Sequence, residues 1–185
     1  MSSQQVTILI FLTCVGGCIG SFLNVVVYRW PRGKSVVRPN SRCPQCDHAI
    51  RAVHNIPVFG WLLLRGKCRD CGGAISGRYA IVEALIAAIF LGLAFHVFDD
   101  ALTTHVVKDD GISTTIASLG SVSGMSDPMR WALYACQVLL LTSLVGAYLI
   151  HRDGFKIPRT LWVAVAIGGV GAGILSVVNH LPLVT

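Results

Sequence analysis

The chain has 185 residues, of which 54% are hydrophobic and only 13% are charged. Soluble domains carry about 25% charged residues, so this composition excludes an ordinary soluble domain and indicates a membrane protein. The formal net charge is +6, and an excess of positive charge also occurs in nucleic-acid-binding proteins. Here the excess is local: residues 29–78 contain ten Lys or Arg and two Asp, whereas residues 99–130 contain five Asp and two basic residues. Because the basic segment lies between apolar runs, membrane topology explains it without nucleic acid, and no nucleic-acid partner is expected.

The first apolar run, residues 6–28, contains no charged side chain and is long enough to cross a bilayer. A cleaved signal peptide would need basic residues before the run, and residues 1–5 contain none. Basic residues follow the run instead, which predicts an N-terminus outside the membrane and a cytoplasmic segment 29–78. Gly16 and Gly20 form a G-x-x-x-G face for close helix contact. We expect Asn24 to make a helix–helix or interfacial hydrogen bond, and Pro31 and Gly33 to end the helix.

The cytoplasmic segment contains two Cys-x-x-Cys pairs, formed by Cys43 with Cys46 and by Cys68 with Cys71. Four thiolates complete a tetrahedral zinc shell, which leaves no open position for substrate, so the predicted Zn²⁺ is structural. The 21 residues between the pairs slightly exceed the usual spacing of roughly 15–20, but a longer loop adds little closure entropy. The alternatives are two disulfides, which a cytoplasmic location disfavours, or a redox-active pair.

Other potential metal ligands have simpler explanations. His48 and His54 could each replace a thiolate, although solvated loop histidines are commoner. Cys14, Cys18 and Cys136 lie in apolar runs, where cysteine usually packs as a small hydrophobe. Cys14 and Cys18 share a helix face, so metal or lipid attachment remains an alternative for them.

The remaining segments follow in order. Residues 55–64 are apolar but too short to span, so they either lie on the membrane surface or pack under the zinc site. Residues 79–98 form a second span, in which Glu83 lies close enough to the inner end to reach water or the basic segment. Residues 99–130 are predicted to be an acidic external loop, and two further spans, 131–150 and 160–178, are joined by a basic inner turn at 151–159. Several glycines in the last span allow close packing, namely Gly168, Gly169, Gly171 and Gly173.

The expected architecture is therefore an all-α membrane protein of about four transmembrane helices with a cytoplasmic four-cysteine zinc loop. Its parts are a first transmembrane helix (1–28), the zinc-binding loop domain (29–78), a second transmembrane helix (79–98), the acidic extracytoplasmic loop (99–130), and a third and fourth helix (131–185). The tail, residues 179–185, is expected outside.

Short motifs run through residues 16–90. Residues 20–31 read Gly-Ser-Phe-Leu-Asn-Val-Val-Val-Tyr-Arg-Trp-Pro, and a spaced series follows at residues 41–46, 55–57, 64–71 and 75–79, with Glu83 beyond it. This series resembles the type IV prepilin peptidase family, membrane aspartyl proteases that cleave prepilin leaders and N-methylate the product. The resemblance implies the zinc loop, a bacterial inner (cytoplasmic) membrane location, a role in type IV pilus assembly or protein secretion, and a prepilin-like substrate or a partner subunit.

The catalytic part of the family pattern is incomplete. Residues 149–161 resemble the segment that carries the first catalytic aspartate, but His151 occupies that position and Asp153 is the only nearby acid. No Asp or Glu follows Asp153, and residues 169–172 keep the glycines of the second motif without its acid. An aspartyl protease needs two carboxylates that share one proton. The chain alone is therefore expected to be a protease-inactive relative, a pseudoenzyme.

Three alternatives stay open. The chain could be an active or split prepilin peptidase or N-methyltransferase subunit, with a second chain supplying aspartates; S-adenosylmethionine would be a cofactor only if methyl transfer is retained. It could be a truncated gene product. It could also be a membrane-tethered zinc-ribbon binding module.

Overall fold

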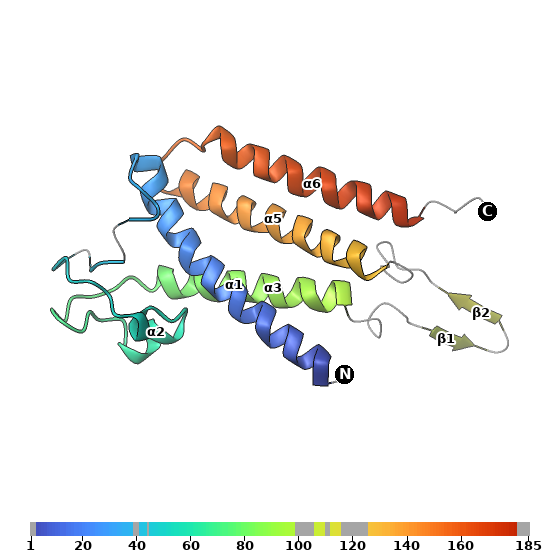
Figure 1. Cartoon of the computed structure of the whole chain (residues 1–185), viewed down its shortest axis with the longest axis horizontal. Helices are drawn as coiled ribbons and strands as arrows, with labels where there is room; N and C mark the ends of the chain where they lie inside the picture. Colours follow the sequence, from blue (N-terminus) through green and yellow to red (C-terminus); the bar gives the residue numbers. More distant parts are fainter. Residues whose placement is uncertain are drawn as a thin grey trace. The chain divides into compact units, whose positions relative to one another are not determined.

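The computed structural model describes residues 3–38, 41–43, 45–98, 106–109, 112–115 and 126–180. Most of the described chain is helical (Figure 1), and the elements follow in the order α1 (Ser3–Arg29), η1 (Trp30–Arg32), η2 (Ala52–Asn55), α2 (Phe59–Leu63), α3 (Arg78–Phe98), β1 (Val106–Asp109), β2 (Ile112–Thr115), α5 (Asp127–Arg152) and α6 (Arg159–His180). Among these, α1, α3, α5 and α6 are long and apolar enough to cross a membrane. This confirms the predicted helical membrane class and its four spans, and each helix runs slightly beyond its predicted limits.

The loop between α3 and α5 contains structure that the sequence analysis did not predict. Strands β1 and β2 pair antiparallel, with Val106 opposite Thr115 and Asp109 opposite Ile112. The loop was expected to be irregular because it is acidic and rich in Ser, Thr and Gly. The rest of residues 99–125 and the tail from residue 181 lie outside the described residues.

The contacts within the chain define two compact units, Met1–Leu91 with Val145–Pro158, and Gly92–Leu144 with Arg159–Thr185. In the first unit α1 packs against α3 through the predicted glycine face. A Cβ atom on Gly16 would lie 2.8 Å from the Phe90 side chain, and one on Gly20 would lie 2.8 Å from Cα of Glu83. Only a residue without a side chain allows the two helix backbones to come this close. Asn24, which is buried, donates a hydrogen bond of 3.1 Å to the Tyr79 carbonyl, as predicted.

The second unit repeats this kind of packing between α5 and α6. A Cβ on Gly168 would lie 2.7 Å from the backbone nitrogen of Leu140, and one on Gly171 would lie 2.7 Å from the sulfur of Cys136. Cys136 therefore packs against a glycine, as expected of a small apolar side chain. Gly169 and Gly173 have no comparably close neighbour, so only two of the four predicted glycines serve this contact.

The glycine contact between α1 and α3 can be tested by substitution. We expect Gly20→Ala to destabilise the protein by roughly 1–3 kcal/mol, because the new methyl group meets the α3 backbone and cannot be accommodated by a rotamer change. Gly92→Ala, in the same helix pair but with nothing within 4 Å, is the matched control and should be neutral or stabilising. Thermal unfolding in detergent, followed by circular dichroism, measures both; equal melting temperatures would contradict the packing argument.

Candidate metal centre

The structure brings the four cysteines of the two Cys-x-x-Cys pairs together. Their sulfur atoms all lie within 4.8 Å of one another, and the closest pairs are Cys43 with Cys71 at 3.9 Å and Cys46 with Cys68 at 4.0 Å. A tetrahedral ion with Zn–S bonds of about 2.3 Å would separate its sulfurs by about 3.8 Å, whereas a disulfide joins them at about 2.05 Å. All four cysteines are free, so the cluster could hold one metal ion such as zinc.

The first pair is held by a tight turn. The Cys43 backbone N–H donates to the His48 carbonyl, and the Asp47 N–H donates to the Cys43 carbonyl, both at 2.9 Å. Asp47 has a φ of 57°, which aspartate tolerates better than most side chains. A single antiparallel bridge between Arg42 and Ala49 closes the turn.

The second pair repeats the same arrangement 25 positions later. Cys68 N–H donates to the Gly73 carbonyl at 2.8 Å, and Gly72 N–H donates to the Cys68 carbonyl at 2.9 Å. Gly72 takes the left-handed conformation, with a φ of 70°, and Lys67 pairs with Ala74. This repeat is visible in the sequence as a basic residue, Cys-x-x-Cys, Asp or Gly, any residue, and Ala. We did not predict it, although that spacing was the available signal.

The local environment gives the thiols of the first pair different acidities. Backbone N–H groups of Gln45 and Cys46 donate to the sulfur of Cys43 and lower its pKa to about 7. A backbone hydrogen bond from His48 also lowers the pKa of Cys46, but burial and the neighbouring cysteine sulfurs outweigh it and raise this pKa to about 12. Metal binding requires thiolates and supplies the positive charge that stabilises them together.

The two histidines considered as ligands lie outside the cluster, which contains cysteines only. His54 instead has its Nε2 atom 3.5 Å from the Arg69 guanidinium. Cys14 and Cys18 are exposed on α1 and do not belong to the cluster. The described residues therefore offer a four-sulfur set, as predicted.

Hydrogen bonds outside the four-cysteine cluster also hold the cysteine loop (residues 29–78) together. Gln45 donates to the Ala74 carbonyl at 3.3 Å and so links the two turns. Trp61, on α2, donates from its ring nitrogen to the Ile75 carbonyl at 3.0 Å, and its ring lies against Gly66, where a Cβ would come within 2.8 Å. The local sequence does not reveal the role of Trp61, because that role depends on a contact between segments 14 residues apart.

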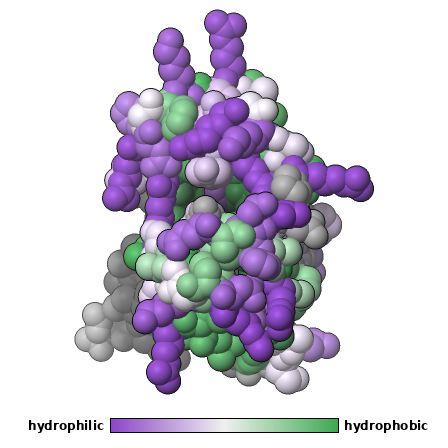
Figure 2. All heavy atoms as spheres, turned by 90° about the vertical axis from the view of Figure 1, so that its left-hand side faces the viewer, coloured by the Kyte–Doolittle hydropathy of each residue, from purple (hydrophilic) through white to green (hydrophobic). Residues whose placement is uncertain are grey.

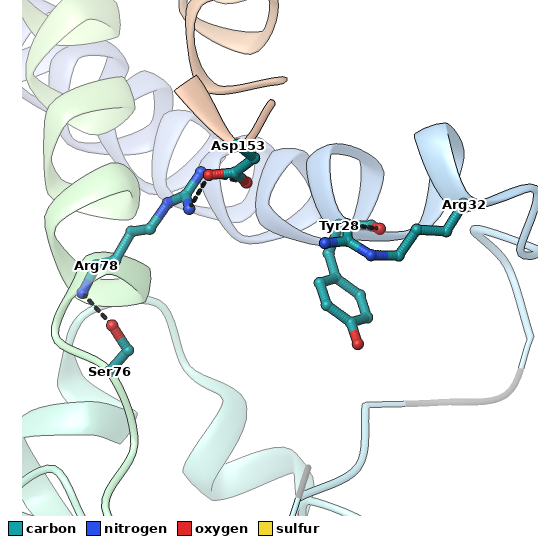
Figure 3. Close-up of polar contacts among 5 residues, drawn as sticks. All are labelled: Tyr28, Arg32, Ser76, Arg78 and Asp153. Carbon is teal, nitrogen blue, oxygen red and sulfur yellow. Dashed lines mark hydrogen bonds and ion pairs between the residues drawn. The ribbon is translucent and has the colours of Figure 1, made fainter. Parts of the chain in front are cut away.

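Asp153, the acid considered in the sequence analysis as a catalytic candidate, is engaged in an ion pair. Asp153 accepts two hydrogen bonds from Arg78, at 2.6 and 2.9 Å (Figure 3). Arg78, by this bonding and by its charge, lowers the pKa of Asp153 below its usual value. Gly154, with a φ of 81°, follows it in the turn that ends α5. His151, two residues before Asp153, is exposed.

A second cation lies near this ion pair. The Arg32 guanidinium lies 4.3 Å from the ring centroids of both Tyr28 and Phe155, and it donates to the Tyr28 carbonyl at 2.6 Å (Figure 3). Cation–π contacts of this kind favour arginine over lysine because the guanidinium is flat. Arg32 and Arg78 were not predicted as special, because nothing in the local sequence distinguishes them from the other basic residues.

Comparison with known proteins shows which proteins the N-terminal half of the chain resembles. Residues 14–97 match the Bacterial Peptidase A24 N-terminal domain. The chain is 52% identical over 81 residues, 44% of its length, to a prepilin leader peptidase/N-methyltransferase of Myxococcus xanthus. It is 44% identical over 108 residues to the corresponding protein of Dichelobacter nodosus, and 44% identical over 99 residues to a type 4 prepilin-like proteins leader peptide-processing enzyme of Escherichia coli. No solved structure matches significantly.

Residues 14–97 are thus similar to the N-terminal domain of bacterial A24 peptidases and to part of the prepilin leader peptidases. The alignments with the three relatives cover 24%, 38% and 37% of their lengths. The chain thus spans well under half of each of these curated relatives.

Metal binding by the four sulfurs predicts a defined stoichiometry. We expect about one zinc ion per chain, because four thiolates complete one shell, and we expect Cys43→Ser or Cys68→Ser to lose most of it. Cys18→Ser, on the exposed face of α1, is the matched control and should keep its metal. Elemental analysis of the purified full chain measures all three; unchanged zinc in both cluster variants would contradict the assignment.

The ion pair predicts a pH-dependent contribution to stability. The pKa of Asp153 is lowered in the folded state, so the pair contributes fully above about pH 4, the usual aspartate pKa, and its contribution is lost as pH falls through the lowered value. Arg78→Gln should therefore cost roughly 0.5–1 kcal/mol at pH 7, since the arginine is partly exposed, and progressively less as pH falls below about 4. Melting temperatures from pH 7 downward test the prediction, with the exposed Arg51→Gln as control; a difference independent of pH would contradict it.

Proposed function

We propose that this chain is a bacterial inner-membrane protein that binds prepilin-like leader segments through its zinc-stabilised N-terminal domain and does not by itself cleave them. The proposal rests first on the family match over residues 14–97. By their names, the relatives process leader peptides of prepilins or prepilin-like proteins. The ten basic residues of the cysteine loop favour a cytoplasmic loop, with the N-terminus on the other side of the membrane.

In this proposal the metal is Zn²⁺ and its role is structural. Four cysteine ligands leave no coordination position for a substrate or an activated water. The bound ion would hold the two turns against each other and thereby order the loop that adjoins α1 and α3. Binding energy for the metal would appear as folding energy of this domain.

The observation that carries the second half of the proposal is the Asp153–Arg78 ion pair. Aspartyl proteolysis uses two carboxylates that share one proton, which requires one of them to be protonated near the working pH. The bidentate contact with Arg78 and the lowered pKa of Asp153 favour the ionised form instead. His151 cannot take the place of an acid in such a pair. These 185 residues therefore lack a working dyad, and cleavage would require aspartates from outside them.

The experiment is an assay of the purified full chain in lipid vesicles with a prepilin carrying its leader. We expect the chain to crosslink to the substrate and to yield no cleaved product by mass spectrometry, while the Myxococcus xanthus relative serves as the positive control. Cleavage by the chain alone, abolished by Asp153→Asn, would overturn the proposal; loss of one member of a catalytic unit typically lowers the rate by roughly 10⁴-fold or more. A parallel reaction with S-adenosylmethionine reports methyl transfer, which would favour a methyltransferase subunit instead.

A further inference from the structure

The apolar segment that precedes α2 packs against the membrane-spanning helices α1 and α3. Pro57 packs on Gly17 of α1, where a Cβ would lie 3.2 Å from the proline side chain. Gly17 is next to Gly16 and three residues from Gly20, and these contact α3 between Glu83 and Phe90. With a rise of about 1.5 Å per residue, Glu83 is already roughly 7 Å inside the start of α3. The loop backbone therefore reaches the depth of the first turns of a membrane span.

The next residue shows how the backbone is accommodated there. Val58 has φ 64° and ψ −53°, and Phe59 N–H donates to the Pro57 carbonyl at 2.6 Å, which together form a strained γ-turn. The N–H of Val58 donates to the buried Glu83 carboxylate at 2.6 Å. Irregular backbone at membrane depth requires partners within the protein, and Glu83 supplies one. This also fulfils the expectation that Glu83 reaches the basic segment.

Helix α2, which begins here, has two different faces. Trp61 points into the cysteine loop and bonds to Ile75. Phe59, Leu62 and Leu63 lie on the opposite side, because positions i, i+3 and i+4 share one face of a helix. Phe59 is 65% exposed and Leu63 is 69% exposed, so this face of three large apolar side chains, the α2 apolar face, has no partner among the described residues.

Exposed basic residues precede and follow the α2 apolar face in the sequence. The helix ends at Leu63, and Arg65, with a φ of 50°, turns the chain away. The exposed basic residues near it in the sequence are Arg51, Arg65, Lys67 and Arg69. Figure 2 looks onto the end of the molecule that carries the loop, and hydrophilic side chains project over most of this face with smaller apolar areas between them. An apolar helix face bordered by Arg and Lys is the pattern of a segment that lies in a membrane interface.

We propose that the α2 apolar face inserts into the bilayer leaflet next to the cysteine loop, with the flanking basic residues on anionic phospholipid headgroups. Pro57 and Val58 are held against α1 and α3, so the adjoining helix lies where acyl chains and headgroups meet. This depth favours a lipid surface over a soluble partner. The insertion would anchor the metal-binding turns close to the membrane. It resolves the two alternatives for residues 55–64, because Trp61 packs within the loop while the other face meets lipid.

The test places a tryptophan on the face in the full chain. Phe59→Trp and the control Asp70→Trp, an exposed position between Cys68 and Cys71, are reconstituted in phosphatidylcholine/phosphatidylglycerol vesicles with and without brominated acyl chains. The fluorescence added by each substitution is read as the difference from the parent chain. We expect the tryptophan at position 59 to be quenched several-fold more than that at position 70. Leu63→Trp carries the same expectation and replaces Phe59→Trp if that variant loses helical circular dichroism.

Three other outcomes would contradict the proposal in whole or in part. Equal quenching at positions 59 and 70 would show that the face does not contact acyl chains and would overturn the proposal. A prepilin leader peptide that shifts the emission of the tryptophan at position 59 in unbrominated vesicles would show that peptide, rather than lipid, occupies the face. Quenching that persists unchanged in phosphatidylcholine alone would overturn the assignment of the basic residues to anionic headgroups.

Discussion

The close contact between α1 and α3 is the constraint on which the rest of the first unit depends. At Gly20 the two helices approach so closely that a single methyl group would meet the α3 backbone. This approach lets Asn24 reach the Tyr79 carbonyl and brings the two ends of the cysteine loop to neighbouring helix ends. The entropy of closing a loop of about fifty residues is then offset in part by helix packing. Pro57 on Gly17 and Val58 on Glu83 are further contacts of the same interface.

Backbone hydrogen bonds shape the two turns that carry the four cysteines. Each Cys-x-x-Cys pair lies in a turn with the same two hydrogen bonds and a positive φ at the residue after the second cysteine. Two similar turns facing each other bring together four sulfurs at spacings close to those of a tetrahedral zinc site.

The ion pair between Arg78 and Asp153, at the end of α5, bears on whether Asp153 could act in catalysis. In a protease dyad, a carboxyl group must be able to hold a proton near neutral pH. Asp153 is held by a guanidinium with both oxygens, and the same contact ties the end of α5 to the start of α3. A stabilising ion pair favours a low pKa for Asp153, whereas a catalytic dyad needs a carboxyl group that can hold a proton near neutral pH. The geometry supports the stabilising role.

The sequence by itself determined the class, the four spans, the glycine face at Gly16 and Gly20, and the four sulfur ligands, because each depends on composition or on spacing within a short stretch. It did not reveal the hairpin of β1 and β2, the pairing of Arg78 with Asp153, or the two opposite faces of α2. Two of these features join residues that are distant in the chain: 75 positions separate Arg78 from Asp153, and 14 separate Trp61, on one face of α2, from Ile75. Which of many similar arginines meets an acid is decided by helix packing, and only the tertiary structure specifies that packing.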